Sequence, residues 1–366
     1  MTDPTDPTDP LVLVMGATGK TGGAVAAQLR SRGVAVRAMV RRRDGRVADL
    51  ERLGAEIVEA DAFDPRAVGE VLRGVQRVYY CPPWHPHMLQ SAVVLATAVR
   101  RSDVQVVVGL SQWLASSHHP SLATRQNWLA DHLFDQLPGV AHATISPGFF
   151  ADNYLSLIGF ASQLGVFPMP LGAGRNAPPS NEDIARVAVA ALLDPQRHAG
   201  NTYRPTGPAL LSGPDMAQIL GEVLGRRVRH VEMPRWMFAK ALRVMGPRFG
   251  LDAFQQTGLR HYLDEHALGA FERGAPTDHV ERVAGVPAED FATIARRYAA
   301  RPEVKRTVGN FLSAVVDFLR IGVTPALDLD RVVASQAHPP VVGPVLAAES
   351  AVWADERDAI THSATG

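Results

Sequence analysis

A glycine-rich segment near the start of the chain has the spacing of a phosphate-binding turn. Residues 16–22 read Gly-Ala-Thr-Gly-Lys-Thr-Gly, between an apolar run at 11–15 and an Ala-rich amphipathic stretch that continues to Arg32. A turn between a buried strand and a helix directs backbone N–H groups and the helix dipole at one phosphate-sized site. The segment therefore predicts dinucleotide binding, and an ordinary structural turn is the alternative.

The residue types in this turn predict separate roles. Gly16 would make the tight turn, Gly19 would allow close backbone approach, and Gly22 would let the helix pack on the strand. Lysine inside the turn could add a positive charge for the phosphates. The residues of the turn that we expect to bind the cofactor are Gly16, Thr18, Gly19, Lys20, Thr21 and Gly22.

The end of the second predicted strand indicates which dinucleotide binds. An NAD-preferring site usually has an acidic residue there, which binds the ribose 2′-hydroxyl. This chain has Arg41-Arg42-Arg43 instead, and guanidinium groups suit bidentate phosphate binding. We predict NADP(H) in preference to NAD(H), bound through Arg41 and Arg42. A solvated basic loop is the alternative, especially because Asp44 follows.

Later strand ends supply further candidates. Asp61 follows the third predicted strand and could either reach the adenine edge or cap the next turn. Pro82 follows the fourth strand and is expected at the cofactor. Ser111 ends the fifth strand, close to where the carboxyl ends of parallel strands would place the nicotinamide. Ser111 is therefore a candidate for both cofactor binding and catalysis.

Histidines near the same strand ends could transfer protons. They are His85, His87, His118 and His119. Imidazole has an ordinary pKa of about 6.5, which suits general acid catalysis. We take His119 as a second catalytic candidate, while exposed loop histidines without a role are the alternative. No metal site is expected, because no further ligand cluster accompanies His85-Pro-His87.

A set of aromatic and polar residues is predicted to form the substrate pocket. Aromatic side chains after the fifth predicted strand and within residues 149–154 would make an apolar pocket above Ser111. Phe149 and Phe150 could equally belong to the core, since aromatic side chains are mostly buried. The predicted pocket residues are His85, Trp113, Phe149, Asn153 and Tyr154.

The elements that would position these residues alternate between strand and helix. Such alternation predicts an α/β fold with a doubly wound parallel Rossmann sheet in residues 11–150. The predicted strands are 11–15, 34–40, 56–59, 77–81 and 104–110, and helices are predicted at 46–53, from 64 onward and at 88–101.

The rest of the chain has a different pattern. Residues 1–10 repeat Thr-Asp-Pro and predict a disordered tail. Residues 151–305 predict a smaller, mostly helical substrate-binding lobe, with helices at 180–193 and 214–224 and strands at 201–205 and 227–231. Residues 306–366 are expected to be a C-terminal extension or arm.

Composition narrows the class of protein. The 366 residues are 46% hydrophobic, and 37 basic and 37 acidic side chains cancel to a formal charge of +0. These figures argue against a disordered chain and against a nucleic-acid-binding protein. The single cysteine, Cys81, excludes an intramolecular disulfide. The apolar stretch 311–327 contains Asp317 and Arg320 and is too short and too charged to span a bilayer.

Several of these segments resemble one family. Similarity to the NmrA-like branch of the atypical short-chain dehydrogenase/reductases covers roughly residues 11–300. This resemblance implies a Rossmann domain that binds NADP and a small C-terminal lobe. It also implies one of two functions. The first is the reduction of quinones, azo compounds or dyes, and the second is redox sensing without turnover. The matching motifs are GATGKTG, Arg41-Arg42, ADAFDP, ISPGFFADNY, SNEDIARVAVAAL and GPALLSGPDMAQILGEVLGRRVRHVEMP.

The chain departs from ordinary short-chain dehydrogenases at the catalytic pair. Those enzymes use Tyr-x-x-x-Lys, in which lysine lowers the pKa of the tyrosine. No lysine occurs here between Lys20 and Lys240, and no tyrosine between Tyr80 and Tyr154. We therefore expect a reductase that transfers hydride from NADPH to a quinone-like or conjugated carbonyl small molecule without that pair.

The alternative function is a non-catalytic NADP(H) redox sensor that acts through a protein partner. The expected location is the cytoplasm, because the N-terminus has no signal-peptide pattern. Neither nucleic acid nor a membrane is expected as a partner, because the net charge is zero and no basic stripe is visible. The sequence leaves the oligomeric state open, including a homo-oligomer.

Overall fold

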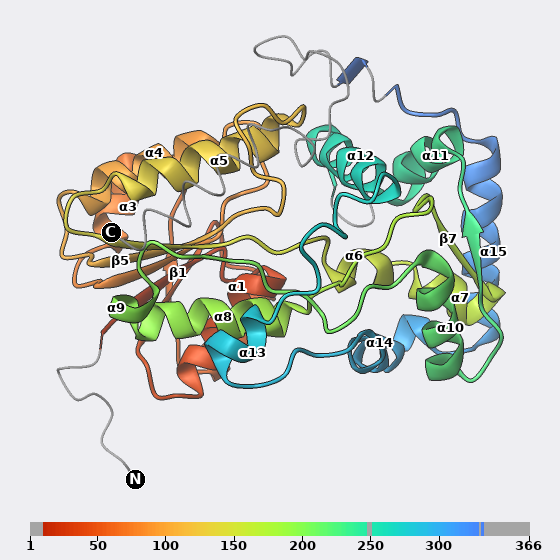
Figure 1. The fold of residues 1–366 in the computed structure, drawn as a ribbon, viewed down its shortest axis with the longest axis horizontal. Coiled ribbons are helices and arrows are strands. Elements are labelled where there is room, and N and C mark those ends of the chain that lie inside the picture. Colours follow the sequence, from red (N-terminus) through yellow and green to blue (C-terminus); the bar gives the residue numbers. More distant parts are fainter. Residues whose placement is uncertain (1–9, 247–250, 329–330, 333–366) are drawn as a thin grey trace.

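A seven-stranded sheet, in which every neighbouring pair of strands is parallel, organises the N-terminal half of the protein (Figure 1). The computed structural model describes residues 10–246, 251–328 and 331–332. The strand order is β3-β2-β1-β4-β5-β6-β8, so the chain runs outward from β1 first to one edge and then to the other. The strands are β1 (Val12–Met15), β2 (Val36–Val40), β3 (Glu56–Glu59), β4 (Arg77–Tyr80), β5 (Val106–Leu110), β6 (Ala141–Ile145) and β8 (Thr202–Tyr203).

Strand β1 explains why the sheet is central to the core. Val12 and Val14 belong to the apolar cluster on one face, while Leu13 and Met15 belong to the cluster on the other. All four side chains are buried. A continuous apolar run is therefore required here, because a central parallel strand has no solvated face.

Helices cover both faces of the sheet, as the doubly wound prediction requires (Figure 1). The helices on one face are α1 (Lys20–Arg30), α2 (Val47–Arg52) and α8 (Asn181–Leu193). Those on the other face are α3 (Pro65–Val71), α4 (Met88–Val99) and α5 (Leu122–Asp135). The predicted α/β Rossmann architecture is thus confirmed, with strand and helix ends shifted by one or two residues in most elements.

Capping residues fix where two of these helices begin. The Asp64 carboxylate accepts a hydrogen bond from the Arg66 backbone N–H at 2.8 Å, and Pro65 occupies the first helical position of α3. Ser180 Oγ accepts from the Asp183 backbone N–H at 2.9 Å and begins α8. Both starts are local in sequence, and the sequence predicted both.

The boundary near residue 150 is less simple than predicted. After leaving the Rossmann domain, the chain returns to it through α8, which packs against α1 (Figure 1). Strand β8 then pairs with β6 at the edge of the sheet. The short helices α9 (Pro195–His198) and α13 (His279–Ala284) also lie beside this part of the fold. Residues 181–203 therefore belong to the Rossmann layers.

The remaining elements form a second lobe around its own apolar core. Its strands β7 (Val166–Met169) and β9 (Arg229–Glu232) pair in parallel. None of the helices in the described ranges is long and apolar enough to cross a membrane. The helices of this lobe are α6 (Ala151–Leu155), α7 (Ile158–Leu164), α10 (Gly213–Leu224), α11 (Arg235–Met245), α12 (Ala253–Ala267), α14 (Phe291–Ala299), a 3₁₀ turn (Pro302–Val304) and α15 (Val308–Val323).

Two elements of this lobe differ from the predicted pattern. Strand β7 is only four residues long and contains Pro168, which argues against a strand when the sequence is read alone. Helix α15 lies in the segment predicted as an extension or arm, and it packs on α7 and α11. Residues 1–9 of the predicted tail and residues 333–366 of the predicted extension lie outside the described residues.

Candidate functional site

The glycine turn lies between β1 and α1, as predicted, and its geometry requires glycine at two positions. Gly16 has a φ of +68°, a backbone conformation that other residues rarely adopt. A Cβ atom at Gly22 would lie 2.3 Å from the Gly16 carbonyl oxygen, so any side chain there would separate α1 from the turn. Helix α1 begins at Lys20 without a side-chain cap, which leaves its first N–H groups to an anion.

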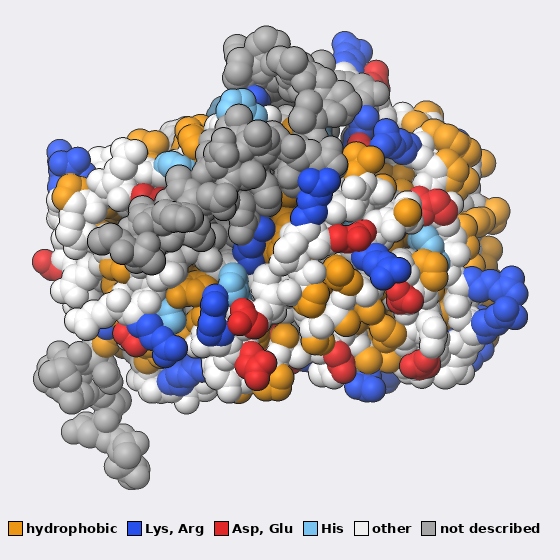
Figure 2. Space-filling model, viewed as in Figure 1, with side chains coloured by type: hydrophobic (Ala, Val, Ile, Leu, Met, Phe, Trp, Pro, Cys, Tyr) orange, Lys and Arg blue, Asp and Glu red, His pale blue; other side chains and the backbone are white. Residues whose placement is uncertain are grey.

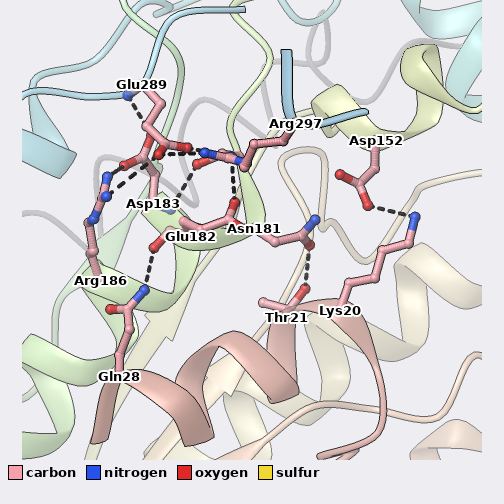
Figure 3. Close-up of polar contacts among 11 residues, drawn as sticks. Lys20, Thr21, Gln28, Asp152, Asn181, Glu182, Asp183, Arg186, Glu289 and Arg297 are labelled. Carbon is pink, nitrogen blue, oxygen red and sulfur yellow. Dashed lines mark hydrogen bonds and ion pairs between the residues drawn. The ribbon is translucent and has the colours of Figure 1, made fainter. Parts of the chain in front are cut away.

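Two other side chains of the turn contact later parts of the chain (Figure 3). Lys20 Nζ lies 2.6 Å from Asp152 Oδ2 on α6, and that carboxylate is almost completely buried. Thr21 Oγ1 donates a hydrogen bond to Asn181 Oδ1 at the start of α8, at 3.0 Å. Asn153, a predicted pocket residue, is half-buried beside Asp152. The turn is therefore held against two helices, and Lys20 already shares its charge with a carboxylate.

The three arginines after β2 differ in what they contact. Arg43 lies 3.1 Å from a Glu51 carboxylate oxygen and also donates to the Ile57 carbonyl oxygen. Arg41 and Arg42 are exposed, and neither forms an ion pair with another described residue. These two guanidinium groups are thus the ones available to a phosphate at the end of β2.

The loops after β3 and β4 contact each other. Asp61 Oδ1 accepts a hydrogen bond from the Phe63 backbone N–H at 3.0 Å, which is the turn-capping role that the sequence left open. The Phe63 ring lies 5.1 Å from the His85 ring, measured between centroids. A Cβ atom placed on Gly16 would lie 3.2 Å from the side chain of Cys81, so the adjacent Pro82 lies at the same edge as the turn.

Ser111, at the end of β5, is bonded to a carboxylate that the sequence analysis did not single out. Its Oγ donates a hydrogen bond to Asp131 Oδ2 on α5 at 2.5 Å. Burial raises the pKa of Asp131 well above the ordinary value, and the hydrogen bond from Ser111 partly opposes that rise. The pair lies at the carboxyl end of β5, one of the strand ends at this edge of the parallel sheet.

His119 is buried between the two lobes. Its Nε2 contacts a carboxylate oxygen of Glu265 on α12, and both side chains are almost fully buried. Burial lowers the pKa of the neighbouring His261 to about 4. His118, by contrast, is exposed. Among the described residues, no group of three or more His, Cys, Asp or Glu side chains could hold a metal ion.

The aromatic residues predicted for the substrate pocket are packed inside the second lobe. Trp113, Phe149 and Tyr154 are at most 2% exposed and belong to one apolar cluster. The Tyr154 hydroxyl oxygen accepts a hydrogen bond from Asn176 Nδ2 at 3.0 Å. Phe149 is therefore a core residue, which was the open alternative, while Phe150 is half-buried against the core of the sheet.

Four polar residues of this region were not predicted to matter. They are Asp131, Asp152, Asn181 and Glu265. Asp131 carried a usable signal, because it lies four positions after the buried Asn127 on the inward side of α5. The partners of the other three become apparent only when distant segments meet.

Comparisons with known proteins decide the family. A model of the NmrA-like family matches residues 8–255. The chain belongs to the NmrA-like family. This confirms the resemblance carried by the glycine turn and the later motifs. The chain is also 32% identical over 292 residues to the NAD(P)H azoreductase of Xenophilus azovorans, covering 79% of this chain and 98% of that protein.

Two solved structures share the fold of this chain. An NADPH-dependent quinone oxidoreductase of Escherichia coli, complexed with NADPH, aligns with a TM-score of 0.65 and 20% identity over 78% of this chain and 99% of its own. Nmra, a negative transcriptional regulator, in complex with NAD, aligns with a TM-score of 0.62 and 17% identity over 79% of this chain and 94% of its own. At this identity the likeness concerns the fold.

Proposed function

We propose that this NmrA-like protein is an NADPH-dependent reductase of quinone-like or conjugated carbonyl small molecules. The observation that carries the proposal is the glycine turn at the end of β1, where Gly22 has no room for a Cβ atom. The azoreductase and quinone oxidoreductase among the similar proteins support this activity. The cytoplasm remains the proposed location.

The described residues fit a nicotinamide dinucleotide. The turn and the first N–H groups of α1 would bind the pyrophosphate, and Arg41 and Arg42 would bind the 2′-phosphate. Asp61 would lie toward the adenine, and Pro82 and Ser111 toward the nicotinamide. The reduced cofactor, when bound, supplies the hydride that the acceptor needs.

The proton that completes the reduction needs a source other than a Tyr-x-x-x-Lys pair. The acceptor gains a hydride at one atom and a proton at another, so one proton must come from a side chain or from water. Ser111 and His119 are the proposed candidates. Asp131 would hold the Ser111 hydroxyl, and Glu265 would hold the His119 ring, each in one orientation.

A redox sensor is the second candidate, and one observation favours it. The Ser111 hydroxyl is already engaged by Asp131, and Trp113 and Tyr154 are buried, so few polar groups face a substrate from this strand end. Such a site would bind NADP(H) and pass its redox state to a protein partner. Zero net charge makes nucleic acid a poor partner for this surface.

The test is NADPH oxidation by the full chain, followed by absorbance, with quinones, azo dyes and conjugated carbonyl compounds as acceptors. We expect at least one acceptor class to accelerate NADPH oxidation. NADPH binding is measured separately by fluorescence. Gly22→Ala should weaken NADPH binding at least tenfold and lower turnover accordingly. Tight NADPH binding without acceptor-dependent oxidation would reject the reductase and favour the sensor. Absence of NADPH binding would reject both.

A further inference from the structure

Helix α15 exposes its apolar side to solvent, whereas an ordinary surface helix exposes its polar side. Its polar residues Asn310 and Asp317 face inward, together with Ile321, on the side that packs on α7 and α11. The opposite side carries exposed, large apolar residues. We call this surface the α15 apolar face, and it comprises Val308, Phe311, Leu312, Val316, Phe318, Leu319 and Val323.

The exposure of this face is large. Val308 is 78% exposed, Leu319 62% and Val323 85%. Together the seven side chains expose on the order of 700 Å², against roughly 300–600 Å² for the largest apolar patch of a typical monomer. Figure 2 shows hydrophobic side chains gathered at the edge of the molecule where α15 runs. A patch of this size indicates a binding surface.

We propose that the α15 apolar face binds α15 of a second copy of this chain, in a two-fold symmetric dimer. Leu312 and Leu319 are seven positions apart, and Val308 precedes Leu312 by four, which is the spacing of helices that pair lengthwise. A two-fold interface requires a self-complementary surface, and an uncharged apolar stripe is one. The exposed area approaches the roughly 800 Å² that each partner buries in a standard interface.

Charge favours a second copy over a lipid surface. Helices that lie on membranes carry basic residues on their polar side, which contact anionic headgroups. The only charged residues of α15 are Asp317, which is buried, and Arg320. The polar side of this helix packs on the protein, so the helix itself offers little positive charge to anionic headgroups.

Helix α15 lies beyond the part of the chain that the family model matches. The family model ends at residue 255, well before the helix. The azoreductase relative is matched over 98% of its length by only 79% of this chain. About a fifth of this chain therefore lies outside that alignment. The inner side of α15 lines one cavity with Lys20 of the glycine turn, whereas the α15 apolar face lies on the opposite side of the helix. The proposed dimer therefore does not rest on the proposed reductase activity.

The test is the molar mass of the full chain in solution, by light scattering and sedimentation over a range of concentrations. We expect twice the mass of one chain for the wild type and a single chain mass for Leu319→Glu. The matched control is Leu268→Glu, because Leu268 is 60% exposed and follows α12 instead of lying on α15. This control should remain dimeric. Circular dichroism and NADPH oxidation per chain should be unchanged in Leu319→Glu, which separates the dimer from the proposed function.

Three outcomes would overturn the dimer. A wild-type chain that stays monomeric at every concentration would do so, as would a Leu319→Glu variant that keeps twice the chain mass. The third is a monomer that sediments with vesicles of phosphatidylcholine and phosphatidylserine and loses that binding in Leu319→Glu. In that case lipid is the partner of the face.

Discussion

Ser111 and Asp131 are joined by a 2.5 Å hydrogen bond at the end of β5, and removal from water raises the pKa of Asp131. A buried carboxyl group without a cationic partner is stable in its neutral form, because burial penalises the charge. The Ser111 hydroxyl is therefore oriented by an acid whose pKa is well above the ordinary value. This relationship affects both stability and the chemistry available at the strand end.

The first prediction is that Asp131 makes stability depend on pH. The folded state holds the proton of Asp131 more tightly than the unfolded state does. The stabilisation that this proton gives to the folded state is complete below about pH 4 and is lost as the pH rises through the pKa of Asp131 in the folded state. The free energy of unfolding should fall by up to about 1.4 kcal/mol per pH unit from this group. The asparagine side chain in Asp131→Asn has no proton to lose, so this variant should lack that part of the change of unfolding free energy with pH.

Urea denaturation of the wild type and Asp131→Asn at several pH values measures the difference. Asp103→Asn is the control, because Asp103 is exposed in the loop before β5. It should leave the slope of the wild type unchanged. Parallel curves for the wild type and Asp131→Asn would show that Asp131 is ionised in the folded protein.

The second prediction concerns the close approach of α1 to the glycine turn. In Gly22→Ala the new methyl group would overlap the Gly16 carbonyl oxygen, since that distance would be 2.3 Å. We expect a loss of about 3 kcal/mol in unfolding free energy and at least tenfold weaker NADPH binding. Gly69→Ala in α3 is the control, because a Cβ atom there meets nothing within 4 Å.

The control should gain up to about 1 kcal/mol, as alanine is the better helix former. Chemical denaturation and a fluorescence titration with NADPH measure both quantities. If Gly22→Ala binds NADPH as the wild type does, the turn is not the phosphate site.

Short-range patterns account for what could be predicted of this protein. The β1 strand, the glycine turn and the starts of α3 and α8 each depend on a few adjacent residues, and each is confirmed. The glycine requirements follow from contacts within the turn itself. The strand predicted at 201–205 is also present, as the two-residue β8.

Long-range contacts account for what could not be predicted. His119 and Glu265 are far apart in the sequence and meet only when α12 packs over the loop after β5. Periodicity identifies which residues share a side of a helix, but it does not tell which side meets the protein. For this reason the apolar stretch at 311–327 was recognised, while the outward orientation of α15 was not.

The third prediction is that His119 and Glu265 stabilise each other across the two lobes. Glu265→Ala leaves the buried His119 ring without its partner, and we expect a loss of about 3 kcal/mol in unfolding free energy. The control is Glu281→Gln on α13, which is exposed and should change stability by less than about 0.5 kcal/mol.

A double-mutant cycle with His119→Gln and Glu265→Gln measures the pair directly. We expect a coupling energy of about 1–3 kcal/mol, because the two groups are in contact and buried. Additive effects would mean that the contact contributes nothing of its own. If His119 also supplies the proton in reduction, His119→Gln should lower kcat at saturating NADPH, whereas Glu281→Gln should not.

The fourth prediction is that Arg41 and Arg42 select the phosphorylated cofactor. Both guanidinium groups are exposed, and each charge-assisted contact to a 2′-phosphate should contribute about 1.5–3 kcal/mol at low salt. Replacing Arg41 and Arg42 together by alanine should weaken NADPH binding by about 100-fold or more and leave NADH binding within about twofold of the wild type.

Arg43→Ala is the matched control for this prediction. It removes the same charge from the adjacent position, but the Arg43 guanidinium group is already bound to Glu51 and the Ile57 carbonyl oxygen. Its effect on NADPH binding should therefore be small. Titrations with NADPH and NADH, each at low and high salt, measure the selectivity, and the NADPH advantage should shrink as salt screens the phosphate. If the double variant binds NADPH and NADH more weakly by the same factor, residues other than Arg41 and Arg42 bind the 2′-phosphate.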